Sequence, residues 1–421
     1  MTQNPITSDN CKICDKELIK FLSLGQMPIA NALVKKEDLS KKEFFYPLDI
    51  GFCPSCYTVQ MFTIIPYEMY LRLDENQKRN YVFFSSTSEV MKQHFKEWAD
   101  EIDKSYLKQD SLVIDIGSND GILLQNFNKN KFKVLGIEPA HNVAEVARSK
   151  GINTITDYIT ETIAKEVVNK FGKARVIASA NVILNIADLN ELMRCINILL
   201  EEEGIFTFED PYLPVILENN TYDQFYDEHI YYFTAHSIKN LVERYNMEIF
   251  DAKFQNVHGG SMRFYVKRKS NKNIKISENV NTILKKEKDI GIDSGKAYQS
   301  FNKNVQQNKN DLIVLLKKLK SEGKRIVGYG AASKGTIVTN FCKLTPSIID
   351  YISDNTPAKQ GLYYPGVHIP IVTPEKFHED NSDYALVFAW NHIKEIMNKE
   401  QDYINKGGKF IIPFPNVQIL P

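Results

Sequence analysis

Short apolar runs alternate with amphipathic stretches over the middle of the chain. The runs SLVIDIG, KVLGIEP, ARVIASAN and GIFTFED lie between residues 90 and 270, and helix-like stretches such as NVAEVARSK separate them. Strands that alternate with helices in this way pair in parallel, and the helices cover both faces of the sheet. We therefore expect a doubly wound, Rossmann-like α/β sheet in this part of the chain.

The same alternation starts again near the end of the chain. The segments RIVGYGAASKGTIVTNF, SIIDYISDN, ALVFAW and KFIIPFP predict four further strands around helices, and hence a second, smaller α/β domain of Rossmann-like type. Between the two patterns, residues 271–324 are rich in Lys, Asn, Gln and Glu and contain few strand formers. We interpret that segment as a helical linker.

Length and composition fit several folded domains. A chain of 421 residues is too long for one hydrophobic core, and its 43% hydrophobic and 25% charged residues are typical of a globular protein. Lys plus Arg equals Asp plus Glu, at 52 each, so no overall field attracts nucleic acid. No stretch approaches the roughly 18 apolar residues of a membrane span, and the first residues lack a signal-peptide pattern. We expect a cytoplasmic protein, with no membrane or nucleic-acid partner.

Four of the six cysteines form two CxxC motifs near the start of the chain. They are Cys11 and Cys14 in CKIC, and Cys53 and Cys56 in CPSC. Two such turns complete a tetrahedral four-thiolate site for zinc, and four protein ligands leave no open position for chemistry. We predict a structural zinc site in a small module, with further strands between the motifs. The alternatives are four buried cysteines or a redox pair.

A glycine-containing turn follows the first strand of the central domain. In VIDIGSNDG, Asp115 ends the strand and Gly117 allows the backbone to approach a ligand, while Glu138 closes the next strand and can bind both ribose hydroxyls. The turn lacks GxGxxG, and its acids would repel phosphates, so a nucleoside without phosphates, such as S-adenosylmethionine, fits best. The alternative is a generic α/β turn. The predicted cofactor-binding residues are Asp115, Gly117, Ser118, Asn119, Gly121, Glu138, Pro139, Asp157, Tyr158, Ala180 and Asn181.

The densest polar and aromatic cluster is YDEHIYYF, residues 226–233. There His229 can act as a general base, Glu228 can orient it, and Tyr226 can donate a hydrogen bond to a developing enolate oxygen. This set suits removal of a proton next to a ketone. The alternative is a tyrosine-rich core strand with a capping histidine.

Two neighbouring segments supply further candidates for a substrate pocket. Arg263 ends VHGGSMR, which is a candidate tight turn at the same cleft. Ser85 and Ser86 belong to YVFFSSTS, which either lines a sugar pocket or caps the helix that follows.

These motifs together resemble a known family. The cysteine pairs, FFSSTSEVMKQHF, DIGSNDGILL, YDEHIYYFT, HGGSMR, VGYGAASKGT and SDNTPAKQG are similar, in order, to the sugar C-methyltransferases that make branched-chain deoxysugars. The resemblance implies a zinc-binding domain at residues 1–70, a class I methyltransferase domain at 71–270, the linker at 271–324, and a C-terminal nucleotide-sugar-binding domain at 325–421. It also implies methylation at C3 of a nucleotide-diphosphate 4-keto-6-deoxy sugar through an enolate.

The resemblance assigns roles to individual residues. It implies that His229 is the catalytic base, that Tyr226 and Glu228 lie beside it, and that Tyr81 lies near the sugar. Asn185 and Asp227 stand where family members often have histidine. The glycine-rich turn of the last domain would hold phosphate, and residues after its next strand would contact the nucleotide. The predicted substrate-binding residues are Ser85, Ser86, Arg263, Gly330, Ala331, Ser333, Lys334, Asp354 and Lys359.

Two rival hypotheses stay open. The first is an enzyme that uses the same cofactor but methylates oxygen or nitrogen of another small molecule. The second is a non-catalytic, zinc-containing adaptor with a degenerate methyltransferase body. We expect a monomer or a weak oligomer in either case.

Overall fold

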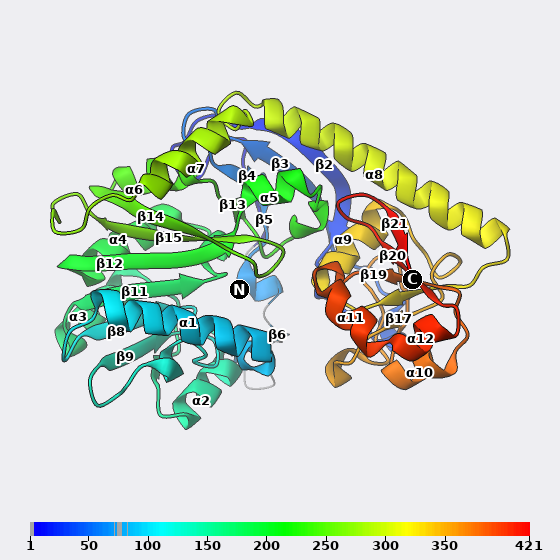
Figure 1. The fold of residues 1–421 in the computed structure, drawn as a ribbon, viewed down its shortest axis with the longest axis horizontal. Coiled ribbons are helices and arrows are strands. Elements are labelled where there is room, and N and C mark those ends of the chain that lie inside the picture. Colours follow the sequence, from blue (N-terminus) through cyan, green and yellow to red (C-terminus); the bar gives the residue numbers. More distant parts are fainter. Residues whose placement is uncertain (1–3, 71, 74–77, 82) are drawn as a thin grey trace.

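The computed structural model describes residues 4–70, 72–73, 78–81 and 83–421. Two lobes, each built around a mainly parallel sheet, lie side by side, and the long helix α8 passes over both (Figure 1). A third, antiparallel sheet from the N-terminal region lies behind and between them. The predicted α/β class with a small N-terminal module and a second C-terminal α/β domain is confirmed.

The N-terminal region forms an antiparallel sheet of order β13-β4-β3-β2, to which the central domain contributes β13. The strand expected between the two cysteine motifs is β3. A short pair, β6 and β7, follows the module and pairs on its own. The strands are β1 (Ile6–Thr7), β2 (Ile19–Pro28), β3 (Phe45–Phe52), β4 (Val59–Met61), β5 (Thr63–Ile64), β6 (Arg72–Leu73), β7 (Arg79–Asn80) and β13 (Tyr231–Tyr232).

The central lobe contains a seven-stranded sheet of order β10-β9-β8-β11-β12-β15-β14. The four predicted strands pair in parallel, but β15 runs antiparallel to both its neighbours, because the HGG turn returns the chain directly beside β14. Periodicity alone did not reveal this hairpin. The strands are β8 (Leu112–Ile116), β9 (Lys133–Ile137), β10 (Asn153–Ile155), β11 (Ala174–Ala180), β12 (Leu200–Pro211), β14 (Met247–Gln255) and β15 (Ser261–Arg268).

Helices cover this sheet as their apolar spacing requires. In α1, residues Met91, Phe95, Trp98 and Ile102 are buried, which places one apolar stripe against the sheet. The hydroxyl of Ser88 accepts a hydrogen bond from the amide of Met91 at 3.4 Å and so caps the helix. The helices are α1 (Glu89–Tyr106), α2 (His141–Ser149), α3 (Glu161–Phe171), α4 (Leu189–Leu199), α5 (Leu213–Glu218) and α6 (Ala235–Glu243).

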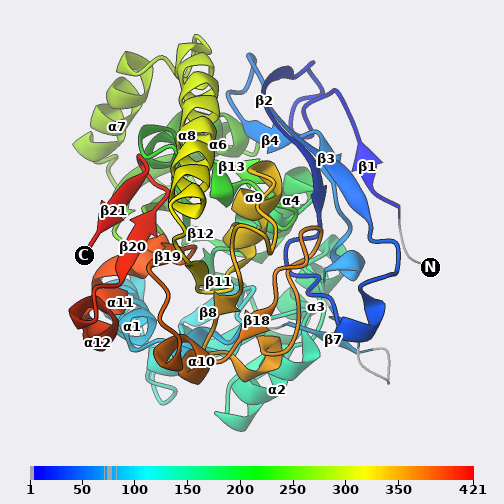
Figure 2. The same ribbon diagram turned by 90° about the vertical axis from the view of Figure 1, so that its right-hand side faces the viewer.

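Two helices occupy the segment between the lobes. Helix α7 (Glu278–Asp289) packs on α6 and β14, and α8 (Lys296–Ser321) packs on α5 and β2. Figure 2 shows α8 beside α7, with the N-terminal strands β2 and β3 to the right of α8. Among the described residues, no helix is long and apolar enough to cross a membrane.

The C-terminal lobe has a six-stranded sheet of order β18-β17-β16-β19-β20-β21. The four predicted strands are present, and the short strands β18 and β21, which lack a strong apolar run, extend the two edges. The elements are β16 (Ile326–Tyr329), α9 (Ser333–Phe341), β17 (Ile352–Ser353), β18 (Ile371–Val372), α10 (Pro374–Glu379), β19 (Tyr384–Val387), α11 (Ile393–Lys399), α12 (Gln401–Asn405), β20 (Lys409–Ile412) and β21 (Gln418–Leu420). The exact domain boundaries stay predictions.

Candidate active site and zinc centre

The four cysteines of the CxxC motifs converge on one point. Their sulfur atoms all lie within 4.8 Å of one another, with Cys11 Sγ 3.5 Å from Cys56 Sγ and Cys14 Sγ 3.4 Å from Cys53 Sγ. A tetrahedral zinc ion with Zn–S bonds of about 2.3 Å needs sulfur atoms roughly this far apart. The cysteines therefore fit a four-thiolate zinc site, and neither a redox pair nor plain core packing explains the convergence of all four.

The second cysteine motif leads directly into the predicted catalytic loop. Strand β4 begins three residues after Cys56 and pairs with β13, which begins two residues after His229. In this register Tyr231 lies opposite Gln60 and Tyr232 opposite Val59. The zinc module therefore holds one end of the catalytic loop.

The glycine-containing turn lies at the carboxyl end of β8, as expected. Gly117 has φ +73°, and a Cβ there would lie 2.3 Å from the Val182 side chain. One oxygen of Glu138 faces the turn, since Oε2 accepts from the Asn119 amide at 2.9 Å, while Oε1 accepts from the Ala140 amide at 2.8 Å, after β9. Each carboxylate oxygen can accept a further hydrogen bond, so Glu138 can still bind ribose hydroxyls. Burial raises the pKa of Glu138 to about 7 and raises that of Asp115 well above its usual range.

The serine-rich segment lies against this turn. The amide of Ser85 donates to Asn119 Oδ1 at 3.0 Å, and the amide of Ser86 donates to Asp120 Oδ2 at 3.2 Å. Lys150 Nζ donates to the Ser86 hydroxyl at 3.1 Å. These contacts place Ser85 and Ser86 beside the predicted cofactor turn, and they occupy the side-chain oxygen of Asn119. The predicted helix-capping role of the segment belongs to Ser88.

The remaining predicted cofactor residues lie around the same edge of the sheet. The ring of Tyr158 packs against that of Tyr67 at an angle of 38°, with centroids 4.1 Å apart, and Arg79 lies over the Tyr158 ring at 4.5 Å. Asp157 is exposed and lies 3.9 Å from Arg79. The buried hydroxyl of Ser118 has no hydrogen-bond partner among the described residues. The others lie at strand ends, with Pro139 after β9, and Ala180 and Asn181 after β11.

The imidazole of His229 is fixed by two neighbours. Its Nε2 lies 2.8 Å from the hydroxyl of Tyr226, and its Nδ1 lies 3.1 Å from the backbone oxygen of Gln224. A carbonyl oxygen only accepts, so Nδ1 carries the hydrogen and Nε2 is the basic nitrogen. Burial and, to a smaller extent, the positive charge of Lys334 together lower the pKa of His229 to about 3. The ring is therefore neutral at physiological pH.

Glu228 does not orient His229, in contrast to the role expected for it. Its Oε2 accepts from the hydroxyl of Tyr81 at 3.1 Å and its Oε1 from the side-chain amide of Asn31 at 2.6 Å. The orienting role belongs to the Gln224 carbonyl. Asp227 accepts a hydrogen bond from the amide of Ala30 at 2.8 Å. The neighbouring acids thus bind the N-terminal module.

Two other predicted residues have distinct surroundings. Asn185 ends a short 3-10 turn after β11, and its buried Oδ1 has no partner among the described residues. Arg263 is 4% exposed and binds Glu209 at 2.8 Å, and it lies over the Trp98 ring at 4.3 Å. Its guanidinium is largely engaged, so the geometry does not favour Arg263 as a substrate contact.

The glycine-rich turn of the C-terminal lobe is already occupied by side chains of the protein. Gly330 has φ +82°, and the amide of Ala331 donates to Asp354 Oδ2 at 2.6 Å. Lys359 Nζ donates to the Ala331 oxygen at 2.8 Å, and the Ser333 hydroxyl donates to Asn31 at 2.8 Å. A carboxylate at the turn repels phosphate, so this geometry does not favour the expected phosphate cradle.

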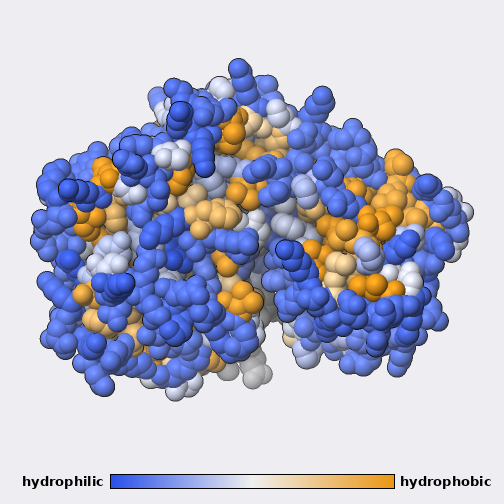
Figure 3. Space-filling model, in the orientation of Figure 1, coloured by the Kyte–Doolittle hydropathy of each residue, from blue (hydrophilic) through white to orange (hydrophobic). Residues whose placement is uncertain are grey.

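Lys334, in contrast, faces the predicted catalytic loop, residues 226–233 (the reacting loop), across the gap between the lobes. Its positive charge lowers the pKa of both His229 and His258. Its Nζ lies 5.5 Å from the ring of Trp390, whose Nε1 donates to Asp223 at 2.6 Å. The space-filling view shows the surface hollowed between the two lobes (Figure 3). A cation is thus available where the lobes meet.

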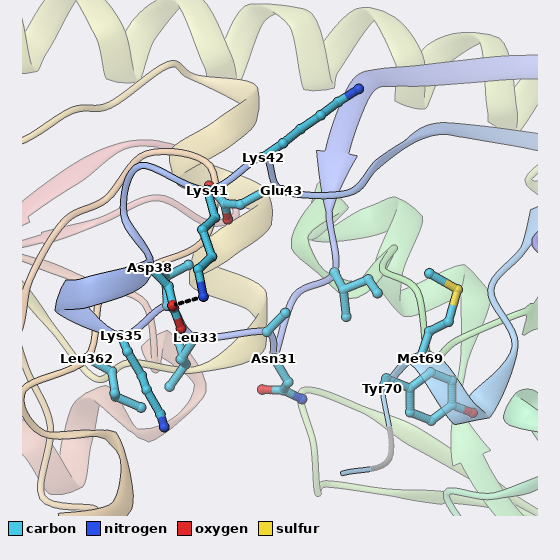
Figure 4. Close-up of a pocket in the computed structure, with 13 residues that line it drawn as sticks. Asn31, Leu33, Lys35, Asp38, Lys41, Lys42, Glu43, Met69, Tyr70 and Leu362 are labelled. Carbon is cyan, nitrogen blue, oxygen red and sulfur yellow. Dashed lines mark ion pairs between the residues drawn. The ribbon is translucent and has the colours of Figure 1, made fainter. Parts of the chain in front are cut away.

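A groove of about 580 Å³ opens beside the reacting loop. Asn31 lines it between a side that carries Met69 and Tyr70 and a side that carries Lys35 and Leu362 (Figure 4). The groove is lined by Ile29, Asn31, Ala32, Leu33, Val34, Lys35, Asp38, Lys41, Lys42, Glu43, Met69, Tyr70 and Leu362.

Sequence reasoning missed Asn31, Gln224 and Trp390. Asn31 follows β2 in the segment PIANAL, which contains no charged residue and no motif. Gln224 acts through its backbone oxygen, which no side-chain pattern reveals. Trp390 could have been found as one of two tryptophans, since it is the last residue of the predicted strand segment ALVFAW.

The sequence comparisons agree with this architecture. The chain is 30% identical over 414 residues to the C-methyltransferase NovU of Streptomyces niveus, and the match covers 98% of this chain and 97% of NovU. The chain belongs to the C-methyltransferase family. Family models match this C-methyltransferase as a zinc binding domain over residues 11–70, a methyltransferase domain over 90–251 and a C-methyltransferase C-terminal domain over 256–415.

Solved structures are similar to this C-methyltransferase over less than half of its chain. An S-adenosylmethionine-dependent methyltransferase from Clostridium acetobutylicum has a TM-score of 0.34 at 15% identity, over 44% of this chain and 93% of that chain. The PH0226 protein from Pyrococcus horikoshii has a TM-score of 0.35 at 12% identity, over 44% and 96%.

The cofactor assignment for this C-methyltransferase follows from the family and the site. It is an S-adenosylmethionine-dependent enzyme with a structural zinc ion. Cys11, Cys14, Cys53 and Cys56 hold the metal. The non-catalytic adaptor hypothesis is set aside by the match to an enzyme over nearly the full length.

Proposed function

We propose that this enzyme methylates C3 of a nucleotide-diphosphate 4-keto-6-deoxy sugar, with His229 as the general base. The observation that carries the proposal is the buried, neutral imidazole, whose Nδ1 is held by the Gln224 carbonyl and whose Nε2 is free of a proton. A fixed tautomer with a basic nitrogen in a polar pocket suits the removal of a proton from carbon next to a ketone.

The pKa of about 3 for His229 is low for a base that works near neutral pH, and its causes indicate how substrate binding would raise it. The causes are burial and the charge of Lys334. A diphosphate placed near Lys334 would neutralise that charge, and the negative charge of an enolate would stabilise the imidazolium. We therefore expect the pKa of His229 to rise when substrate binds.

The proton and electrons follow a simple course in this proposal. The C3 proton moves to Nε2 of His229, and its electron pair forms the enolate, with negative charge on the C4 oxygen. Tyr226 releases Nε2 and donates its hydroxyl hydrogen to that oxygen. When bound, S-adenosylmethionine would supply the electrophilic methyl group that C3 takes, and the thioether S-adenosylhomocysteine would be the leaving group. The imidazolium then returns its proton to solvent.

The position of Tyr81 supports a joint site for cofactor and sugar. Its hydroxyl donates to Glu228, and the negative charges of Glu228 and Glu138 both raise its pKa well above the usual range. Tyr81 therefore lies between the reacting loop and the cofactor turn. We propose that it contacts the sugar, as Asn185 does from the end of β11.

The groove beside Asn31 offers room for the nucleotide arm. It contacts the reacting loop through Asn31 and carries Lys35, Lys41 and Lys42, although Lys41 is paired with Asp38 at 2.7 Å. Lys35 and Lys42 are then the cations that would attract the diphosphate on this side, with Lys334 on the other. We retain Lys359 and Ser333 as predicted nucleotide contacts of the C-terminal lobe.

A direct assay tests the proposal. Zinc-loaded protein is mixed with S-adenosylmethionine and dTDP-4-keto-6-deoxyglucose, and the sugar is analysed by mass spectrometry for one added methylene group. The same sugar reduced with borohydride is the control, because an O- or N-methyltransferase does not need the ketone. Methylation of the reduced sugar, or full turnover by His229→Asn, would contradict the proposal.

A further inference from the structure

Asn31 connects three parts of the chain through its side-chain amide. Its Nδ2 donates to Glu228 Oε1 at 2.6 Å, and its Oδ1 accepts from the Ser333 hydroxyl at 2.8 Å. Asn31 comes from the N-terminal module, Glu228 from the reacting loop of the central lobe, and Ser333 from the first turn of α9 in the C-terminal lobe. The two polar atoms of one side chain therefore join all three parts.

The direction of this bridge is fixed by its chemistry. A carboxylate only accepts hydrogen bonds, so the NH2 group of Asn31 must face Glu228. The remaining oxygen then accepts from Ser333. An aspartate at position 31 would place a second carboxyl group against Glu228, and an alanine would leave that oxygen of Glu228 without its donor.

The backbone beside Asn31 makes a second, parallel connection. The amide of Ala30 donates to Asp227 Oδ1 at 2.8 Å, and the hydroxyl of Thr336 donates to the Ala30 oxygen at 2.9 Å. Residues 30–31 thus join the reacting loop to α9 twice. The Thr336 bond supports the segment without touching Glu228.

Glu228 depends on such donors because it is buried among groups that do not favour its charge. The titratable groups that face it are Tyr81, Tyr226 and Asp227. Burial raises its pKa, while the hydrogen bonds from Asn31 and Tyr81 lower it. Among the residues that the structure describes, no lysine or arginine forms an ion pair with Glu228.

We infer that Asn31 is a positioning residue for the methyl transfer: it keeps Glu228 ionised and aligned as the acceptor for Tyr81, and it ties this alignment to the C-terminal lobe through Ser333. This inference rests on the proposed function. The N-terminal module then contributes to the reaction beyond its zinc ion, since the contact of Ser333 with Asn31 helps to set the geometry of Glu228 and Tyr81.

The pH profile of kcat tests the inference with the full-length, zinc-loaded enzyme. Loss of a hydrogen bond to a buried carboxylate raises its pKa, so the acid limb of the profile should move to higher pH in Asn31→Ala and further in Asn31→Asp. At pH 7 we expect kcat to fall about 10- to 100-fold in Asn31→Ala, with a smaller change in the KM for the sugar. Ser333→Ala should move the limb the same way, and Asn31→Ala/Ser333→Ala should move it no further than Asn31→Ala.

Thr336→Val is the matched control, because it weakens the same contact between the N-terminal module and α9 but leaves Glu228 untouched. Its acid limb should stay where the wild-type limb is. An Asn31→Ala enzyme with an unmoved limb, or a Thr336→Val enzyme with an equal shift, would overturn the inference.

A second measurement separates failure of this inference from failure of the proposed function. A wild-type enzyme that does not methylate the keto sugar removes the proposed function. The contact itself is then tested by unfolding, since Asn31→Ala should change the unfolding equilibrium constant about tenfold less in a Glu228→Gln background than in wild type. Equal effects in both backgrounds would remove the positioning role as well.

Discussion

The hydroxyl of Tyr226 lies 2.8 Å from Nε2 of His229, the nitrogen that must be free to take a proton. Because Nδ1 of the same ring donates to the Gln224 carbonyl, the tyrosine hydroxyl donates to Nε2 in the substrate-free enzyme. A substrate carbonyl that takes this hydrogen bond away from Nε2 would free the base and polarise the ketone in one movement. In the proposed mechanism, the pair therefore stays inactive until a ketone enters.

Replacement of Tyr226 by phenylalanine should separate these two effects. Tyr226→Phe leaves the base free but removes the donor for the enolate oxygen, so kcat should fall about 10²- to 10³-fold while the affinity for S-adenosylmethionine is kept. Steady-state kinetics and calorimetry measure the two quantities. Tyr231→Phe, which loses a buried hydroxyl bonded to the Ala187 oxygen, is the control and should retain kcat. Equal losses in both variants would contradict the role of Tyr226.

His229 should make the stability of the free enzyme fall in acid. The unfolded chain protonates this histidine near pH 6.5, whereas burial holds the folded pKa at about 3, so the unfolded state binds more protons between these values. Stability from the neutral ring is complete above about pH 6.5 and decreases as the pH falls towards 3. Relative to wild type, His229→Gln should therefore gain about 2 kcal/mol in unfolding free energy between pH 8 and pH 5. Urea unfolding at both pH values measures this gain, and parallel pH dependences would show that the ring protonates normally in the fold.

Loss of zinc should disorder the reacting loop as well as the module. Cys53→Ser removes one of four ligands, and the free energy of structural zinc binding is of the order of 10 kcal/mol, so the module should unfold and β4 should no longer hold β13. Hydrogen exchange of residues 226–233, together with zinc content, measures this effect. Cys195→Ser changes a buried cysteine outside the cluster and should keep both zinc and protection. Unchanged exchange in zinc-free Cys53→Ser would show that the loop is held by other contacts.

Glu138 should control cofactor affinity. Its two oxygens already accept the amides of Asn119 and Ala140, so Glu138→Gln both replaces one acceptor by a donor and disturbs the turn. We expect S-adenosylmethionine to bind about 10- to 100-fold more weakly by calorimetry, with little change in the affinity for dTDP. Glu145→Gln is the control, since Glu145 is exposed on α2 and pairs with Arg148. A weaker affinity for both ligands would instead indicate damage to the fold.

The sequence predicted the fold well where a repeated pattern existed. The parallel strands β8, β9, β11 and β12 are continuous apolar runs, because helices cover both their faces. The spacing of the cysteine pairs indicates a metal site and few other structures. The β14–β15 hairpin and the edge strands β18 and β21 were missed, since their pairing depends on neighbours distant in sequence.

The site could be predicted only in part. The chemistry of His229 and of the four cysteines could be predicted from their residue types. The structure places each of them in an environment that fits the prediction. The partners of these residues could not be predicted from the sequence. A backbone carbonyl orients His229, and a neutral asparagine 197 positions away in the sequence binds Glu228. Arg263 was predicted as a substrate contact from its turn motif, but its guanidinium forms a buried ion pair with Glu209.

The pairing of β13 with β4 limits how this protein can be recombined. A hybrid that takes residues 1–70 from one relative and the rest from another would pair β4 of one protein with β13 of the other. These two strands would not have evolved as partners. Exchange of the predicted catalytic loop, residues 226–233, between relatives should therefore succeed only when the paired strand, residues 59–61, is exchanged with it.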